Sequence, residues 1–370
     1  MEQENKEKIH KRFGKTEKRL LVSCVCLVLA GGLMMLAETA EGFAEWYAEN
    51  VYPLLVFLIG HLTGAVSFSL AEIGVYALVL SVIITAIRAG IRGKRERNYG
   101  REALRWASGL FLTATVLFLL YVMNCGINYR RVSFSEEEGL ITKEYSTEEL
   151  REVCEWLTEE LNLRADKVER DQDGVMILEE QSEKRAVQAM KSLSEQYDSL
   201  DGYYPQPKKL AVSETLSYQS LTGIYSPFTV EANYNGDMMP YNIPFTACHE
   251  LSHLRGFMQE EEANFIAFLA CESAKETEFQ YSGYLLAWIY SMNTLYRVDS
   301  EQWSEVRDGL DEPVEADLQA NNRFWDFYEG AVSELADKVN DTYLKVNGQA
   351  DGVKSYNRMV DLLVVYYQNK

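Results

Sequence analysis

The stretch ACHELSHLRGFMQEEEAN, residues 247–264, contains an H-E-x-x-H motif, a glycine three residues after it and an acidic cluster at residues 260–262. On a helix, His249 and His253 lie one turn apart and face the same side. Two neutral imidazoles at this spacing can bind one zinc ion, and Glu250 can take the proton from a zinc-bound water. The motif therefore predicts the chemistry of a zinc peptidase, although H-E-x-x-H also occurs in helices that bind no metal.

The residues after the motif supply a turn and a third ligand. Gly256 is suited to end the helix with a positive φ. Catalytic zinc commonly takes two histidines and one glutamate. Glu260 is the first choice because Asn264 lies one helical turn after it, where its amide could orient a ligand. Glu262 is second and Glu261 third. For each of them the alternative is a solvated helix start, where acids stabilise the helix dipole.

The chain has 370 residues, and its charge is distributed unevenly. Residues 106–370 hold 22 Lys and Arg against 45 Asp and Glu, so this part carries the formal net charge of −20. Phosphate binding requires clustered Lys and Arg, so nucleic acid is not an expected partner. The six cysteines are scattered without a C-x-x-C pair. Neither a disulfide framework nor a cysteine zinc site is therefore expected. Cys248 and Cys271 flank the motif region and could approach each other, but buried free thiols are expected there.

Three apolar stretches predict membrane-spanning helices at about residues 20–37, 69–87 and 106–124. The first stretch has the length of a signal-peptide core, but no clear Ala-x-Ala site follows it and further apolar spans do, which favours a retained helix. Residues 52–68 are expected to form an interfacial or re-entrant segment. The lipid membrane is thus a predicted partner of the chain.

The charges that flank the spans predict their orientation. Residues 1–19 and 88–105 are basic, whereas residues 38–50 are acidic and aromatic, as expected of a loop at the membrane surface. The positive-inside rule puts the basic N-terminus and the predicted basic loop over residues 88–105 in the cytoplasm. The prediction is a multi-pass protein of the cell membrane with a cytoplasmic N-terminus. Residues 1–128 form its anchor, and residues 129–370 form a domain outside the membrane.

Periodicity in residues 129–370 predicts an α+β domain that is mostly α. A helix is expected from a cap at Ser146 or Thr147. The spacing of apolar residues predicts further helices over residues 179–200, 263–274, 281–298, 315–345 and 353–367, and residues 242–244 open the motif helix. Runs of β-branched and aromatic residues predict strands over 209–213 and 223–234. Polar residues within 281–298 and acidic flanks favour a buried core helix there over a fourth span.

Several stretches together resemble a known family: GIYSPFTVEAN at 223–233, HELSHLRGF at 249–257, EEEANFIAFLAC at 260–271, and the closing segments Asn347-Gly348-Gln349, Asp351-Gly352-Val353 and Ser355-Tyr356. They are similar to the bacterial domain of unknown function family 3810 (DUF3810). The resemblance implies a membrane-anchored protein with a gluzincin-like, zinc metallopeptidase-type domain. The resemblance covers most of the chain, including the N-terminal spans.

This resemblance implies a zincin-like (gluzincin) fold with a small sheet, zinc at His249, His253 and a glutamate of the cluster, and a catalytic Glu250. The E-x-x-A-N sequence from Glu260 is similar to the E-x-x-A-D/N pattern of gluzincins, whose first glutamate is the ligand. Only the six residues 254–259 separate His253 from Glu260, fewer than in most gluzincins.

The sequence therefore predicts a membrane-anchored zinc metallopeptidase that hydrolyses peptide bonds of a peptide or protein substrate outside the membrane. The expected cofactor is Zn²⁺. Tyr225, Tyr234 and Tyr356 are candidates for stabilising an oxyanion. Two other classes are a sensor or regulator that signals through the spans, and an envelope interaction protein with a structural metal site. Glu250 disfavours a purely structural site because metal binding does not need it.

Overall fold

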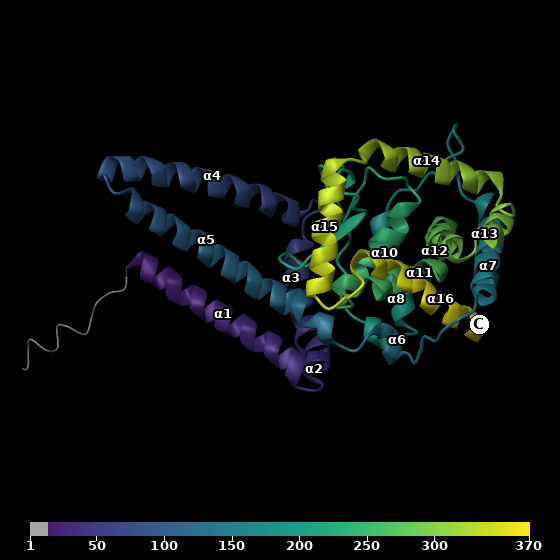
Figure 1. Cartoon of the computed structure of the whole chain (residues 1–370), viewed down its shortest axis with the longest axis horizontal. Helices are drawn as coiled ribbons and strands as arrows, with labels where there is room; N and C mark the ends of the chain where they lie inside the picture. Colours follow the sequence, from purple (N-terminus) through teal and green to yellow (C-terminus); the bar gives the residue numbers. More distant parts are fainter. Residues whose placement is uncertain (1–13) are drawn as a thin grey trace, which may run out of the picture.

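The computed structural model describes residues 14–370, which form an arm of three long helices and a helical domain around a small sheet (Figure 1). The predicted basic residues Lys6, Lys8, Lys11 and Arg12 lie outside the described residues. Within the described residues the fold is mostly helical with one three-stranded sheet. This composition confirms the prediction of a mostly α fold with a small β component.

The arm consists of α1 (Lys15–Thr39), α4 (Leu70–Glu96) and α5 (Tyr99–Tyr121), and both α1 and α4 pack along α5. A π-helical turn, η2 (Val122–Gly126), continues α5. In residues 14–370 these three helices are long and apolar enough to cross a membrane. Each coincides with one of the three predicted spans, so the prediction of three membrane-spanning helices is supported by length and composition.

The prediction of a basic loop over residues 88–105 is wrong. α4 continues to Glu96 and α5 begins at Tyr99, so the turn between them consists of Arg97 and Asn98. Arg97 has a φ of +52°, and the Asn98 side chain accepts a hydrogen bond from the Arg101 N–H at 3.1 Å. Lys and Arg are good helix formers, so a run of them does not end a helix. The turn and the start of α1 lie together at the far end of the arm (Figure 1).

Two short helices join the near ends of α1 and α4. α2 (Phe43–Asn50) occupies most of the segment that was predicted as a loop over residues 38–50, and α3 (Tyr52–Thr63) covers the predicted interfacial segment. Tyr52, at the start of α3, is fully buried and its hydroxyl donates to the Leu254 carbonyl at 3.0 Å. The connection between the first two arm helices is therefore packed against the helix that carries the H-E-x-x-H motif.

The near end of α4 is bound to the sheet by a buried carboxylate. Glu231 accepts hydrogen bonds from the backbone N–H groups of Leu70 and Ala71 at 3.1 and 2.7 Å, and it pairs with Lys208. A carboxylate satisfies the free N–H groups of a helix N-terminus and interacts favourably with its dipole. Glu72 makes the reverse connection, because its carboxylate accepts the N–H groups of Ala211 and Val212.

The chain leaves the arm through η3 (Asn128–Arg130) and α6 (Phe134–Glu137), and then forms α7 (Thr147–Ala165), α8 (Ser182–Ser194) and η4 (Asp198–Leu200). Ser146 caps α7, and Glu149 completes a capping box. The sheet follows, with β1 (Lys208–Lys209), a short α9 (Glu214–Ser217), β2 (Gly223–Ser226) and β3 (Glu231–Tyr234). β3 is central; it pairs parallel with β1 and antiparallel with β2.

Two strand predictions need correction. Residues 223–234 form a hairpin rather than one strand, because Pro227 and the positive φ of Val230 turn the chain between β2 and β3. The predicted strand over residues 209–213 is reduced to the pair Lys208–Lys209, since Val212 and Ser213 already belong to the turn that leads into α9. The sequence pattern at both places shows β-forming residues but not where the pairing stops.

Three helices form the core of the domain. α10 (Asn242–Leu254) carries the H-E-x-x-H motif, α11 (Glu260–Glu272) follows it, and α12 (Thr277–Val298) packs on both. Tyr281, Tyr284 and Leu285 of α12 are buried, which confirms the prediction of a buried core helix over residues 281–298. Cys248 and Cys271 are buried free thiols, as predicted.

The remaining helices enclose this core. They are α13 (Ser300–Arg307), α14 (Glu312–Tyr328), α15 (Ala331–Val346), η5 (Gly352–Arg358) and α16 (Met359–Asn369). The prediction of one helix over residues 315–345 is wrong, because the chain breaks at Glu329 and Gly330 and changes direction between α14 and α15 (Figure 1). The predicted final helix over residues 353–367 begins as the 3-10 segment η5.

Candidate metal centre

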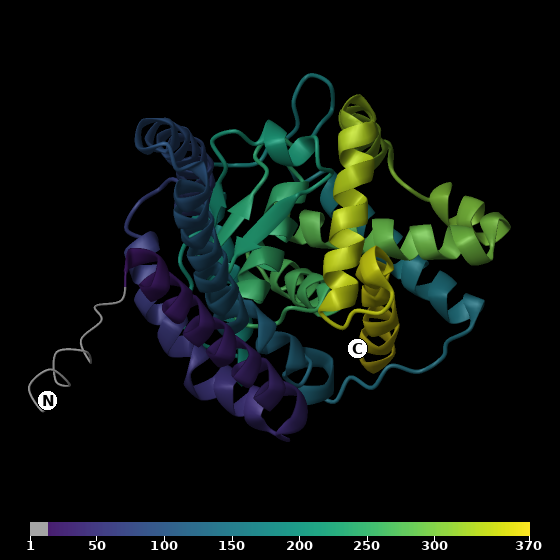
Figure 2. The same ribbon diagram turned by 60° about the vertical axis from the view of Figure 1, so that its left-hand side comes forward.

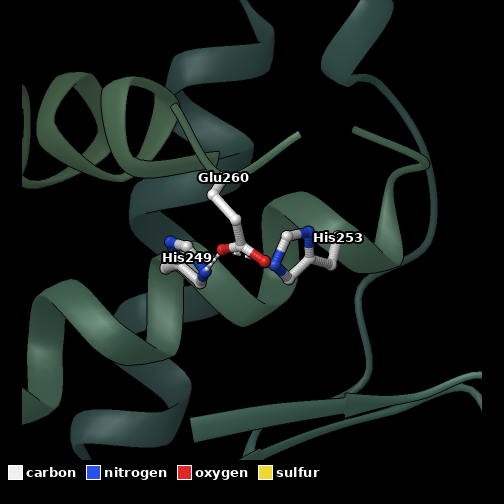
Figure 3. A group of neighbouring side chains, drawn as sticks. All are labelled: His249, His253 and Glu260. Carbon is white, nitrogen blue, oxygen red and sulfur yellow. Dashed lines mark ion pairs between the residues drawn. The ribbon is translucent and has the colours of Figure 1, made fainter. Parts of the chain in front are cut away.

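The two histidines of the motif lie one turn apart on α10. Their ring centroids are 4.6 Å apart, and both residues are 8% exposed. Residues 242–254 are almost entirely buried, so the helix is fixed between the sheet and the other core helices. The predicted shared face of His249 and His253 is therefore confirmed, and it points toward the start of α11 (Figure 3).

A tight turn brings the start of α11 back to the histidines. Gly256 has a φ of +96°, as predicted, and an added Cβ would approach Asn128 and Tyr52 to 3.3 Å. Only the six residues 254–259 separate His253 from Glu260, and this turn makes that short connection sufficient.

Glu260 completes a cluster of three potential ligands. Its Oε2 lies 3.2 Å from His249 Nε2 and 3.6 Å from His253 Nε2 (Figure 3). One ligand atom from each residue lies within 4.8 Å of the other two. Two ligands that are each about 2 Å from a tetrahedral zinc lie about 3.3 Å apart, so the observed spacing fits a zinc ion.

The outer nitrogens of both imidazoles are already engaged. His253 Nδ1 lies 2.8 Å from the Phe257 carbonyl, which can only accept, so this nitrogen carries the proton. His249 Nδ1 lies 2.8 Å from Asn264 Oδ1, while Asn264 Nδ2 donates to the Tyr356 carbonyl at 3.4 Å. When such an imidazole is neutral, its Nε2 lone pair faces Glu260. Two Nε2 lone pairs beside one carboxylate are the donor set of a cation site.

The neighbouring glutamates are engaged elsewhere. Glu261 accepts from Gln349 Nε2 at 2.5 Å, and Glu262 accepts from the Ser135 N–H and hydroxyl at 3.0 and 2.5 Å. Of the three candidate ligands in the acidic cluster, the structure places Glu260 beside the histidines. Asn264 was expected to orient a ligand. Its amide oxygen lies within hydrogen-bond distance of His249 Nδ1, which is the geometry that this role requires.

Glu250 lies beside this cluster and is 4% exposed. Its Oε2 has no hydrogen-bond partner among the described residues. Its Oε1 faces strand β2 so closely that a Cβ on Gly223 would come within 2.5 Å of it. A side chain at position 223 would therefore displace Glu250. Sequence reasoning placed Gly223 only at the start of a strand, since its contact with Glu250 depends on the tertiary fold.

Burial and pairing shift the acidity of these groups. Burial raises the pKa of Glu250 to about 7, and the two imidazoles oppose this rise. Burial also acts to lower the pKa of His253, but the Glu260 carboxylate outweighs it and the pKa rises to about 9. Burial raises the pKa of Glu260 as well, yet the imidazoles hold it well below its usual range. The cluster thus favours an ionised Glu260 next to a positive charge.

The three tyrosines proposed for an oxyanion lie in different places. Tyr234 donates to Glu183 at 2.6 Å, and the Tyr225 hydroxyl is bonded to that of Tyr52 at 3.0 Å. Tyr356 lies in η5, where its pKa is raised well above the ordinary value by burial and by the charges of Glu260 and Glu250. Sequence reasoning missed Tyr290 on α12, whose pKa is raised to about 12 by burial and by the charge of Glu260. Tyr290 lies in an apolar helix, where nothing in the sequence marks it as a site residue.

Comparison with known proteins identifies the family and nothing more specific. No curated protein and no solved structure matches the chain. Residues 47–364 match the family described as "Protein of unknown function (DUF3810)". The match begins in α2 and ends in α16, so it includes α4, α5, the sheet and the whole candidate metal centre. The chain is therefore a member of the DUF3810 family, as its sequence resemblance indicated.

Proposed function

We propose that the chain is a membrane-anchored zinc metallopeptidase in which His249, His253 and Glu260 hold the metal and Glu250 is the general base. One observation carries the proposal. The Nε2 atoms of both histidines converge on Glu260 Oε2 while both Nδ1 atoms are engaged by acceptors. A buried carboxylate oxygen of Glu250, free of hydrogen bonds among the described residues, lies beside them.

The arrangement of elements supports a zincin of the gluzincin type. The motif helix α10 carries two of the proposed ligands, the glycine turn follows it, and α11 carries the third, while the β2–β3 hairpin lies against the motif helix. This order is the one that the sequence resemblance implies. A purely structural metal site would not require Glu250, and it would not require a glycine at position 223 to admit that carboxylate.

Each residue has a distinct task in peptide hydrolysis. Zinc held at the three ligands would supply Lewis acidity toward a water molecule and a peptide carbonyl. Glu250 accepts the proton of the attacking water on its free oxygen and passes it to the leaving amine. Asn264 and the Phe257 carbonyl fix the ring orientation of the two histidines. The burial of the cluster limits access of bulk water to the reacting groups.

Strand β2 is positioned to align a substrate. Within residues 14–370 it pairs with β3 alone and is therefore an edge strand, and it lies against α10 next to Glu250. Ile224 of β2 is 47% exposed. An extended peptide can add to such an edge by backbone hydrogen bonds, which suits an enzyme that acts on polypeptides.

Purification of the full chain with Glu250→Gln as a variant tests the proposal. Zinc content is measured together with cleavage of a broad peptide library. Both proteins should contain one zinc per chain, and the variant should cleave about 10²- to 10⁴-fold more slowly. Glu312→Gln, at the exposed start of α14, is the matched control and should keep full activity. A chain without bound zinc would refute the metal centre. A zinc-containing chain that cleaves nothing would favour a sensor or regulator.

The proposed location follows from the arm. Both basic segments that the structure describes, the start of α1 and the α4–α5 turn, lie at the end of the arm far from the domain (Figure 1). If the positive-inside rule applies, this end is cytoplasmic and the candidate metal centre lies outside the cell membrane.

A further inference from the structure

α15 presents its more apolar face to the outside. Val332, Leu335, Val339 and Val346 are 56%, 63%, 62% and 76% exposed, and Tyr343 beside them is 40% exposed. These five residues, called the α15 stripe here, recur at helical spacing. The residues of α15 that are buried are Ser333 and Leu344. A helix at the surface of a soluble domain turns its apolar stripe inward, and α15 does the opposite.

The C-terminal end of the stripe lies at the near end of the arm. The Tyr129 hydroxyl donates to that of Tyr343 at 3.4 Å, and the ring of Tyr121, the last residue of α5, lies edge-on to Tyr343 at 6.3 Å. Just beyond α15, Asn347 accepts from the Tyr121 hydroxyl at 2.5 Å and from Arg130 Nη1 at 2.8 Å. These contacts fix the C-terminal end of α15 to the near end of the arm.

α15 crosses the direction of the arm, and no other element covers its outer face in Figure 2. Figure 1 shows α15 between the arm and the rest of the domain, running across the direction of the arm. Figure 2 shows it at the front of the molecule without another element over it. Its charged residues lie away from the stripe, on the other side of the helix: Glu334, Asp337, Lys338, Asp341 and Lys345.

A second helix at the same junction has the same property. α3 buries Tyr52, Val56 and Gly60 against the domain and exposes a row of large apolar side chains. The exposed row is Leu54, Phe57, Leu58 and Leu62, at 62%, 52%, 61% and 76%. α3 connects two arm helices at their near ends and so must lie at the level where the arm leaves a membrane. Two helices about 280 residues apart in sequence thus expose apolar faces at one level.

We infer that the α15 stripe lies in the surface of the same lipid bilayer that the arm spans. A helix with an apolar face and an opposite charged face lies in the plane of the interface with its apolar side chains among the lipids. Tyrosines such as Tyr121 and Tyr343 are typical of this level. The inference rests on the arm as a membrane anchor and is independent of the proposed peptidase activity.

Bilayer attachment of α15 would reach the candidate metal centre through a short segment. Gln349 follows α15 and donates to Glu261, and Tyr356 of η5 accepts from Asn264, whose amide oxygen lies at His249 Nδ1. These contacts connect the segment after α15 to residues around the candidate metal centre.

Spin labels on the full chain in lipid nanodiscs test the inference. Labels are attached at Leu335→Cys and Val339→Cys, and at their neighbours Glu334→Cys and Lys338→Cys as matched controls on the charged side. Cys24→Ser is the background, because Cys24 is the exposed native thiol and the other five are buried. Collision of the labels with oxygen, which partitions into lipid, is compared with collision with a water-soluble nickel chelate.

The expected result is that the preferred collision partner, oxygen or the nickel chelate, changes between adjacent positions of α15. Labels at 335 and 339 should collide more with oxygen, and labels at 334 and 338 more with the nickel chelate. Preferential collision with the nickel chelate at all four positions would overturn the inference. Shielding of 335 and 339 from both reagents would overturn it as well, because protein rather than lipid would then cover the stripe. A difference between adjacent positions would also show that α15 keeps its helical geometry in the labelled chains.

Discussion

At the scale of single residues, the candidate centre depends on which glutamate faces the histidines. Glu260, Glu261 and Glu262 are adjacent in sequence, but a helix directs them to three different sides. Glu260 faces two Nε2 atoms, Glu261 faces Gln349, and Glu262 faces Ser135. This division predicts that substitutions of neighbouring glutamates have very different effects on zinc.

Glu260→Gln should weaken zinc binding by more than about 100-fold, because it removes a charged ligand. Loss of a residue that only hydrogen-bonds to a ligand costs up to about 100-fold. Glu261→Gln is the matched control, with the same chemical change one residue away. Its zinc affinity should stay within a few fold of the unsubstituted chain. Competition with a fluorescent zinc chelator measures both affinities. Equal losses at the two positions would rule out Glu260 as the third ligand.

Asn264→Ala should weaken zinc binding by about 10- to 100-fold, because it frees the His249 ring that the amide oxygen holds at 2.8 Å. Ser273→Ala, at the exposed end of the same helix, is the control and should leave the affinity unchanged. The same chelator competition applies. If Asn264→Ala bound zinc as tightly as the control, the Asn264–His249 contact would have no part in the centre.

At the scale of elements, the features that depend on a few neighbouring residues could be predicted from the sequence. The motif helix, the positive φ of Gly256 and the Ser146 cap of α7 each follow from a few neighbouring residues. The break between α14 and α15 was missed because one glycine in an amphipathic pattern is a weak stop signal. The approach of Gly223 to Glu250 was missed because it joins two segments that only the fold brings together.

A buried carboxylate joins α14 to the core. Asp317 is fully buried and accepts from Arg170 Nη1 at 2.8 Å, from the Tyr281 hydroxyl at 2.6 Å and from the Met176 N–H at 2.8 Å. Asp317→Ala should lower the free energy of unfolding by about 3–5 kcal/mol, since it leaves Arg170 without its buried partner. Chemical denaturation of the full chain in detergent measures the loss.

The control for this substitution lies on the same helix. Asp326 is exposed, and Asp326→Ala should change the free energy of unfolding by less than about 0.5 kcal/mol. Asp317→Asn keeps the size of the side chain and removes its charge, so it should fall between the two. A loss for Asp317→Ala no larger than that of Asp326→Ala would show that the pair with Arg170 does not hold α14.

At the scale of the whole molecule, the arm and the domain are joined by buried polar contacts and not by a flexible linker. Glu231 caps α4, Tyr52 of α3 donates to α10, and Arg130 holds the segment after α15. Three apolar stretches were enough to predict three candidate spans, but residues 43–63 were not predicted to pack on the motif helix. Hydropathy reports the preference for lipid and carries no information on such contacts.

The orientation of the whole chain gives the last prediction. Alkaline phosphatase is active only outside the cytoplasm, and green fluorescent protein exported in unfolded form fluoresces only inside it. Fused after Lys370, the phosphatase should be active and the fluorescent protein dark. Fused after Arg97, in the α4–α5 turn, the two reporters should behave in the opposite way, because the basic residues around this turn favour the cytoplasmic side. A fusion after Asn50, at the domain end of the arm, should match the one after Lys370. Fluorescence of the fusion after Lys370, together with phosphatase activity of the fusion after Arg97, would show the opposite orientation, with the candidate metal centre in the cytoplasm.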